Sequence, residues 1–102
     1  MNLVRHEIFV EHFEEIGDYE MAEYLLQQLI QFRNRNFPAQ AKELIYDYYN
    51  LALVQEAQDK SNEAFASARK AFFIALEHQP SKKVSIFEIS QLIEQLYRTE
   101  VA

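Results

Sequence analysis

Glycine and proline are the residues that most often turn a chain, and this 102-residue sequence contains only Gly17, Pro38 and Pro80. Average usage puts Gly at about 7% and Pro at about 5% of residues. Tight β-hairpins and phosphate-binding loops both need glycine at fixed positions. The scarcity of these residues therefore argues against an all-β fold and against a glycine-loop nucleotide fold.

Apolar residues recur at helical spacing in five stretches, which polar residues separate. We predict helices over residues 3–16, from about 19 to 34, from about 39 to 58, from about 64 to 79 and from about 84 to 99. Gly17 is predicted as the C-cap of the first helix and Asp18 as the N-cap of the second. The expected fold class is all-α, with five antiparallel helices in a single domain.

The sequence also shows self-similarity at a period of 42 residues. A shift of this length aligns Pro38 with Pro80 and Ala22 with Ala64, and it carries Leu3 to apolar residues at positions 45 and 87. The period divides the chain into a first helix hairpin at about 1–38, a second at about 39–80 and a terminal helix at about 84–99. We therefore expect two and a half stacked hairpins, a piece of a right-handed α-solenoid. An unrelated five-helix bundle is the alternative.

Residues 48–52, Tyr-Tyr-Asn-Leu-Ala, resemble the first-helix signature of the tetratricopeptide repeats, an aromatic residue followed by leucine and a small residue. Ala64, Ala68 and Ala71 stand where the second helix of such a repeat carries small side chains. His6 replaces the aromatic residue in the first repeat, and the lengthened period is similar to that of the peptide-sensing regulators of Gram-positive bacteria. The resemblance implies a helical repeat that binds peptides or proteins.

Side chains for catalysis or metal binding do not occur at useful spacings. The chain has no cysteine and one glycine, and none of its serines stands in a Gly-x-Ser-x-Gly motif. His6 and His12 are six residues apart and fall on different faces of a helix, and no Glu-x-x-His pair occurs. We predict that the protein is not an enzyme and uses no metal or other cofactor.

Sixteen acidic against ten basic residues give the chain a formal net charge of −6, and the acids are concentrated within residues 1–23. Such a surface repels phosphate, and the basic clusters at residues 33–35 and 82–83 suit helix ends and solubility, so we expect no nucleic-acid partner. No apolar run is long enough to span a bilayer, and no secretion signal is visible. The expected location is therefore cytoplasmic, without membrane contact.

A polar and aromatic face lies beside the packing stripe on the first helix of each expected hairpin and on the terminal helix. In stacked helical hairpins these helices line a concave surface that can bind a partner. The predicted partner-binding residues are Glu7, Glu11, Glu14, Tyr46, Tyr49, Asn50, Leu53, Glu56 and Gln91. Asn50 is the main candidate, because its amide can donate and accept at once, which suits an extended peptide backbone. A hydrogen bond within the helix stack is the alternative role for Asn50.

The terminal helix carries more apolar residues than one packing stripe requires. Phe87, Leu92, Leu96 and Tyr97 are therefore candidates for self-association, as a homodimer through this helix. The alternatives are that the terminal helix caps the stack within its own chain, or that it packs on another partner.

Three hypotheses for function remain open. The first is a module that binds a protein or peptide in its concave groove, as a regulator, adaptor or chaperone. The second is a small acidic inhibitor whose glutamates, between residues 7 and 15, mask a basic site on another protein. The third is a sensor fragment of a peptide-responsive transcription regulator. The expected partner is a protein or peptide. We expect a basic one if the partner contacts the acidic first hairpin.

Overall fold

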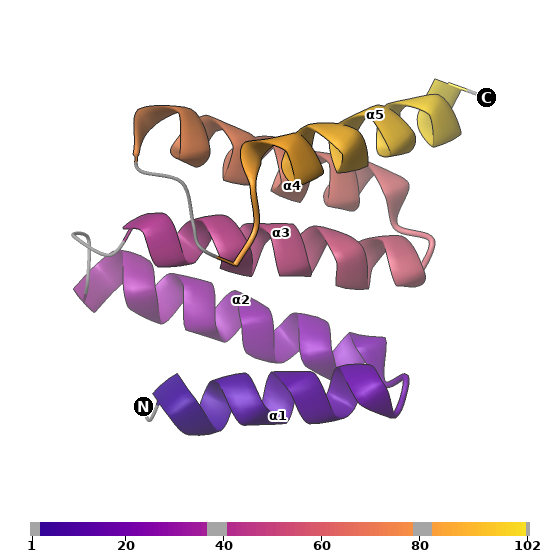
Figure 1. Ribbon diagram of the computed structural model, residues 1–102. Coiled ribbons are helices and arrows are strands. Elements are labelled where there is room, and N and C mark those ends of the chain that lie inside the picture. Colours follow the sequence, from indigo (N-terminus) through magenta and orange to yellow (C-terminus); the bar gives the residue numbers. More distant parts are fainter. Residues whose placement is uncertain (1–2, 37–40, 79–82, 102) are drawn as a thin grey trace.

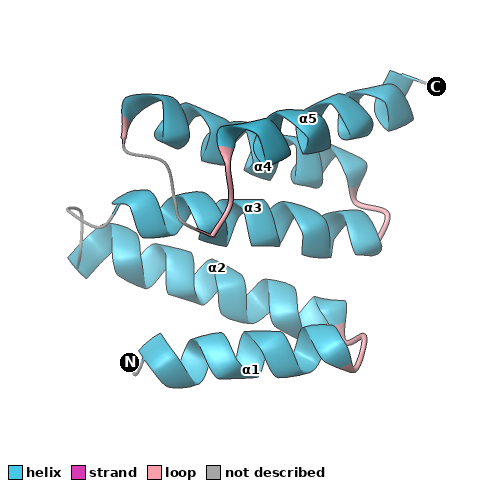
Figure 2. Cartoon of the chain, in the orientation of Figure 1, coloured by secondary structure: helices cyan, strands magenta, loops and turns pink. Residues whose placement is uncertain are grey.

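The computed structural model describes residues 3–36, 41–78 and 83–101, and within them the chain forms five α-helices and no strand (Figure 1; Figure 2). The helices are α1 (Leu3–Glu15), α2 (Tyr19–Asn36), α3 (Ala41–Ala57), α4 (Ser61–Glu77) and α5 (Ile86–Val101). The all-α prediction is confirmed, and the helix ends lie within a few residues of those predicted. Pro38 and Pro80, the predicted turns between hairpins, lie outside the described residues.

The helices form a stack in which each packs against its neighbour in the chain. α1 packs on α2, α2 on α3, α3 on α4, and α4 on α5. Figure 1 shows α1 at one end of the molecule and α4 with α5 at the other. Side chains of α5 also reach α3, because Ile89 shares a buried cluster with Ile45.

The two turns inside the hairpins have the same geometry and lie 42 residues apart. Gly17 (φ 80°) follows α1 and Asp59 (φ 61°) follows α3, both in the left-handed region. After α1, the N–H of Gly17 donates to the carbonyl of Glu14 at 3.1 Å, and the N–H of Asp18 donates to that of Phe13 at 2.8 Å. After α3, residues 59 and 60 donate in the same way to residues 56 and 55, at 2.9 and 3.0 Å. This pair of bonds is a left-handed helix C-cap, so the predicted helix end at Gly17 is confirmed.

Side chains cap the beginning of two helices. The N–H of Met21 donates to Oδ1 of Asp18 at 3.2 Å, so Asp18 caps α2 as predicted. The N–H of Glu88 donates to Oγ of Ser85 at 3.1 Å, one residue before α5 begins. The polar residues between the apolar stripes therefore set where these two helices begin.

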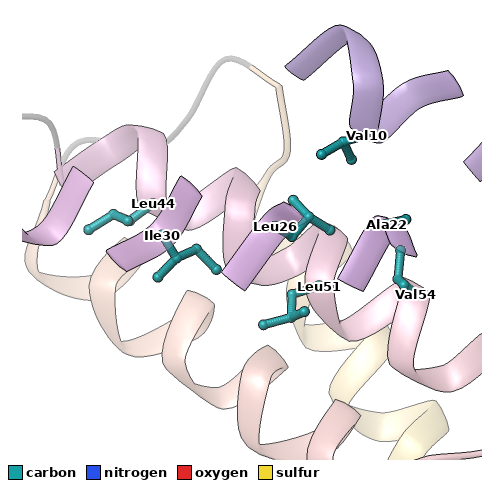
Figure 3. Close-up of a cluster of buried hydrophobic side chains, with 7 residues drawn as sticks. All are labelled: Val10, Ala22, Leu26, Ile30, Leu44, Leu51 and Val54. Atoms are coloured by element: carbon teal, nitrogen blue, oxygen red, sulfur yellow. The ribbon is translucent and has the colours of Figure 1, made fainter. Parts of the chain in front are cut away.

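Three clusters of buried apolar side chains hold the stack together. The first joins α1, α2 and α3 (Figure 3) and consists of Val10, Ala22, Leu26, Ile30, Leu44, Leu51 and Val54. The other two join α3, α4 and α5. The alanines at positions 64, 68, 71 and 75 of α4 are at most 4% exposed, and their small size lets α4 approach α3 closely. α3 is thus covered from both sides and forms the centre of the core.

The buried clusters correct the self-association prediction for two of its four residues. Leu92 and Leu96 are buried and belong to the same cluster as Ala52 of α3, so they contact their own chain. A helix that packs against two others needs a broader apolar face than one that packs against a single neighbour, which explains the apparent excess in α5. Phe87 and Tyr97 are exposed, and the hypothesis of contact through α5 now depends on them alone.

Candidate functional site

A buried arginine joins three helices at the face formed by α1 and α3. Arg33 of α2 is 5% exposed, and its guanidinium forms ion pairs with Glu7 of α1 and Asp47 of α3. Each pair is also a hydrogen bond, made through a different terminal nitrogen of Arg33. The Nε donor is buried and has no partner among the described residues. Arg33 therefore holds α1 and α3 at a fixed separation and keeps two carboxylates side by side.

Beside this ion cluster lies a narrow cleft of about 30 Å³, which we call the acidic cleft. It is lined by Glu7, Val10 and Glu11 of α1, Leu26 and Leu29 of α2, Tyr46, Asp47 and Asn50 of α3, and Lys83. A volume of this size holds a group as large as a water molecule or an ammonium group. A ligand can therefore insert one small group into the acidic cleft, while the rest of it lies across the rim.

Asn50 is held in place by a glutamate of α1. Its Nδ2 donates to Oε1 of Glu14 at 2.8 Å, and the residue is 8% exposed. Burial raises the pKa of Glu14 and outweighs the opposing bond from Asn50, and the charge of Glu11 adds to the rise. Because a planar amide that donates on one side carries its oxygen on the other, this bond fixes the direction of Oδ1. Asn50 thus makes a hydrogen bond within the stack and also lines the acidic cleft.

Three carboxylates line the acidic cleft, and Arg33 pairs with two of them, those of Glu7 and Asp47. Burial raises the pKa of Asp47 to about 6, against the opposing effect of Arg33, and the charges of Glu7 and Glu43 add to the rise. Burial also raises the pKa of Tyr46, and the surrounding carboxylates add to that rise. The burial of Arg33 would lower its pKa, but its two acidic partners raise it instead, so the guanidinium stays charged.

Lys83 places a second positive charge at the acidic cleft. Its Nζ lies 4.9 Å from the centre of the Tyr46 ring, a distance at which an ammonium group is attracted to the face of an aromatic ring. The acidic cleft therefore already accommodates a cation at its edge.

The structure divides the predicted partner-binding residues between two places. The acidic cleft includes Glu7, Glu11, Tyr46 and Asn50, with Glu14 bonded to Asn50. The other four residues, Tyr49, Leu53, Glu56 and Gln91, do not line it. Charge and hydrogen-bonding groups therefore converge between α1 and α3, which makes this region the candidate site.

The residues outside the acidic cleft lie on α3 and α5. Tyr49 packs against the buried clusters shared with α5, and burial raises its pKa with added effects from Glu88 and Glu56. Nε2 of Gln95 donates to Oε2 of Glu56 at 3.3 Å. Leu53 is exposed on α3, and Gln91 is exposed on α5. These four residues therefore lie outside the acidic cleft.

Sequence reasoning missed Arg33, Asp47 and Lys83. The basic cluster at residues 33–35 was interpreted as a helix cap and a solubilising group, and this is wrong for Arg33, which is buried and paired. A signal for the pair was available, because Asp47 stands three residues after Leu44 and four before Leu51, in the buried stripe of its helix. An acid at such a position needs a cation.

A second polar cluster ties α2 to α3 and α4. Glu23 accepts from Gln55 at 3.0 Å, from Gln58 at 3.0 Å and from Lys60 at 2.8 Å, and Oγ of Ser67 donates to Gln55 at 2.6 Å. Burial would raise the pKa of Glu23, but these donors together lower it. A wider groove of about 540 Å³ passes over Gln55 and Ser67 between α2 and α4. The mutual bonding of these side chains gives the cluster a structural role.

Among the described residues, no group of acids and histidines could hold a metal ion. No helix in the same part of the chain is long and apolar enough to cross a bilayer. No protein-family model matches the sequence, and no curated protein or solved structure matches it. The function of the chain must therefore be inferred from its own residues.

Proposed function

We propose that this protein is a non-enzymatic binding module that holds a positively charged segment of a peptide or protein at the acidic cleft. The observation that carries the proposal is the convergence of Glu7, Glu11 and Asp47 on one small cleft beside the fixed amide of Asn50. The glutamates come from α1 and the other two residues from α3. The site therefore exists only when the two hairpins are stacked, as expected for a binding surface built from helical repeats.

The chemistry of the acidic cleft matches a ligand rich in hydrogen-bond donors. Ionised carboxylates can only accept, and the amide of Asn50 already uses an Nδ2 hydrogen on Glu14, which leaves its oxygen to accept from the ligand. Lysine, arginine and backbone N–H groups supply donors, and bonds from the charged ones are the stronger. The small volume fits the ammonium of one lysine side chain. We therefore expect a lysine-containing segment to bind more tightly than an acidic one.

Two features beyond the acidic cleft support a peptide or protein ligand. The C-caps of α1 and α3 recur 42 residues apart with the same hydrogen bonds, as a helical repeat requires. The sequence around Asn50 resembles the first helix of a tetratricopeptide repeat, and that resemblance implies peptide binding on this helix.

The test is a titration of a fluorescently labelled lysine-rich peptide and of its glutamate-rich counterpart, followed by anisotropy. The wild type is expected to bind the first peptide only. Glu11→Gln removes a carboxylate that lines the acidic cleft and lowers the affinity about two- to fivefold, as for one exposed charge pair. The matched control is Glu20→Gln, which makes the same change on the exposed side of α2 and leaves the affinity unchanged. Equal binding of both peptides, or equal loss in both variants, would contradict the proposal.

A second candidate function is the masking of a basic surface by the outside of α1, which the exposed carboxylates of Glu11 and Glu15 favour. Asn50→Ala separates the two, because a residue that is 8% exposed contacts only a group that enters the acidic cleft. If the ligand enters the acidic cleft, this variant should bind it less tightly. If the outside of α1 masks a basic surface instead, the affinity should be unchanged. In the masking mode, affinity falls steeply with ionic strength, whereas backbone and apolar contacts in the cleft mode make that fall shallower.

A further inference from the structure

The acidic cleft contains a mobile type of cation that belongs to the chain itself. Among the described residues that line the cleft, Lys83 alone comes from outside α1, α2 and α3. Its Nζ lies 4.9 Å from the centre of the Tyr46 ring, within the range at which an ammonium group is attracted to an aromatic face. An ammonium group of the protein therefore already lies at the site to which the proposed ligand brings another.

The residues that follow Lys83 hold its backbone against the stack. Val84 is 3% exposed and belongs to the buried cluster that contains Ile45 of α3. Tyr46 packs against the same cluster, so the burial of Val84 brings the backbone of Lys83 beside this ring. Ser85 then caps the beginning of α5. The backbone at this point is therefore fixed on both counts, and the flexible four-carbon stem of the lysine is the part that can move.

The carboxylates of the acidic cleft are already partly neutralised. Arg33 pairs with Glu7 and Asp47, so the carboxylate that remains for another cation is that of Glu11. A ligand ammonium and the ammonium of Lys83 compete for this negative charge, and they also repel each other because their charges are alike. Arg33 is 5% exposed and held by two acids, whereas Lys83 is exposed. Lys83 is thus the cation of the cleft that can move aside.

We propose that Lys83 is a tethered competitor for the acidic cleft, which a ligand cation must displace before it binds. This inference rests on the proposed function and adds the regulation of the same site. A group tethered by a short flexible link is present at an effective concentration of about millimolar. Single amines at lower concentrations therefore do not occupy the cleft. A peptide segment displaces Lys83 because its contacts with the rim add to those of its ammonium group.

The first test repeats the anisotropy titration of the lysine-rich peptide with Lys83→Met, which keeps an apolar stem beside the ring and removes the charge. We expect the affinity to rise about two- to fivefold. The matched control is Lys70→Met, because Nζ of Lys70 lies 5.5 Å from the ring of Tyr48, in the groove between α2 and α4. Each variant removes one positive charge, so a general gain in attraction for a cationic peptide appears in both. A gain that is specific to the acidic cleft appears in Lys83→Met alone.

The second test observes the lysine side chain directly, by heteronuclear NMR of isotope-labelled protein. The ring of Tyr46 should shift the signals of the hydrogens on Cε of Lys83 away from their positions in the urea-unfolded chain. Saturation with the unlabelled peptide should return these signals toward the unfolded positions, because the side chain leaves the ring.

The outcomes separate this inference from the proposed function. Equal affinity of the wild type and Lys83→Met would overturn the inference and leave the proposed function in place. An equal gain in Lys83→Met and Lys70→Met would do the same, as would a bound peptide that leaves the Lys83 signals unchanged. A lower affinity in Lys83→Met would also overturn the inference, because Lys83 would then contribute to binding. Absence of binding in the wild type and in Lys83→Met would overturn the proposed function and this inference together.

Discussion

At the scale of single residues, the ion cluster of Arg33, Glu7 and Asp47 determines both the shape and the charge of the candidate site. A buried ion pair adds little stability compared with apolar side chains of similar volume, yet removal of one partner is costly because the other charge stays buried. Asp47 is 3% exposed, and it is the acid most affected by such a loss. Arg33 is thus the residue whose replacement should reveal the electrostatics of the acidic cleft.

We expect Arg33→Met to lower the free energy of unfolding by about 3–5 kcal/mol at pH 8, because Asp47 is then ionised, buried and without this partner. The loss should be at least about 1 kcal/mol smaller at pH 5. Asp47 has a pKa of about 6 in the folded wild type, and loss of Arg33 raises it further, so the carboxyl is protonated at pH 5. An acid whose pKa is higher in the folded state than in the unfolded state stabilises the folded state at low pH. This stabilisation is lost as the pH rises through the pKa of the folded state. Urea unfolding at the two pH values measures the difference.

The control for this prediction is the same substitution in an Asp47→Asn background. Asparagine does not ionise, so the cost of Arg33→Met should become independent of pH between 5 and 8. A cost that is equal at both pH values in the parent chain would show that Asp47 does not titrate as inferred.

The ion cluster also shows where sequence reasoning fails at this scale. The sequence predicted the acids of α1 and Asn50 for one partner-binding face, and the structure brings Glu7, Glu11 and Asn50 together at the acidic cleft. The 42-residue shift pairs the acids of α1 with residues 49, 53 and 56 instead, and those do not line it. Arg33 was not placed with them, because its burial depends on two other helices that approach α2 from different directions. No local pattern around residues 33–35 carries that information.

At the scale of elements, the C-caps of α1 and α3 allow two residue types to be compared at the same backbone position. The left-handed position is filled by Gly17 after α1 and by Asp59 after α3, with φ of 80° and 61°. Residues with a β-carbon are strained in this region, whereas glycine is not. The same backbone position is therefore occupied once by the favoured residue and once by a less favoured one.

We expect Gly17→Ala to lower the free energy of unfolding by about 1 kcal/mol, and Asp59→Gly to raise it by about 0.5–1 kcal/mol. No atom lies within 4 Å of a β-carbon built on Gly17, so the cost in the first variant comes from backbone strain alone. Thermal unfolding of both variants measures the two effects. Shifts of the same sign would contradict the equivalence of the two turns.

A second prediction at this scale concerns the bonds that tie α2 to α3 and α4. We expect Gln55→Ala to lower the free energy of unfolding by about 1–3 kcal/mol, because it removes a donor to Glu23 and the acceptor of Ser67, both buried. Denaturant unfolding measures the loss. Gln95→Ala serves as the comparison, since it removes an exposed bond to Glu56 and should change stability by less than about 0.5 kcal/mol. Equal losses in the two variants would contradict a structural role for the Glu23 cluster.

The helices themselves could be predicted from the sequence because each carries a clear apolar stripe and a polar break. Gly17 and Asp18 mark one boundary by their own backbone and capping preferences. The role of the α5 stripe could not be predicted in the same way, because a stripe shows that a side is covered and not what covers it. Leu92 and Leu96 are covered by their own chain, whereas Phe87 and Tyr97 are exposed.

At the scale of the whole molecule, the order of packing follows the order of the chain. α3 lies between α2 and α4 and shares buried clusters with α1 and α5 as well. α1 packs mainly on α2, and its outer face has no covering element among the described residues. The stability of the stack is therefore expected to be highest at its centre and lowest at α1.

This difference in local stability should appear in the rates at which backbone amide hydrogens exchange with solvent deuterium. α1 can open without disrupting α3, so its amides should exchange fastest among the hairpin helices and those of α3 slowest. Mass spectrometry of peptic fragments measures the rates, and uniform protection across α1 and α3 would contradict the gradient.

The position of the acidic cleft at this labile end has a consequence for any ligand. Because the walls of the acidic cleft include Glu7 and Glu11, opening of α1 removes half of the binding groups at once. A bound cation must therefore keep α1 closed, and part of its binding free energy goes into ordering that helix. Ligand binding should slow deuterium uptake in α1 far more than in α4, so that occupancy of the cleft is recorded in the exchange rate of a single helix.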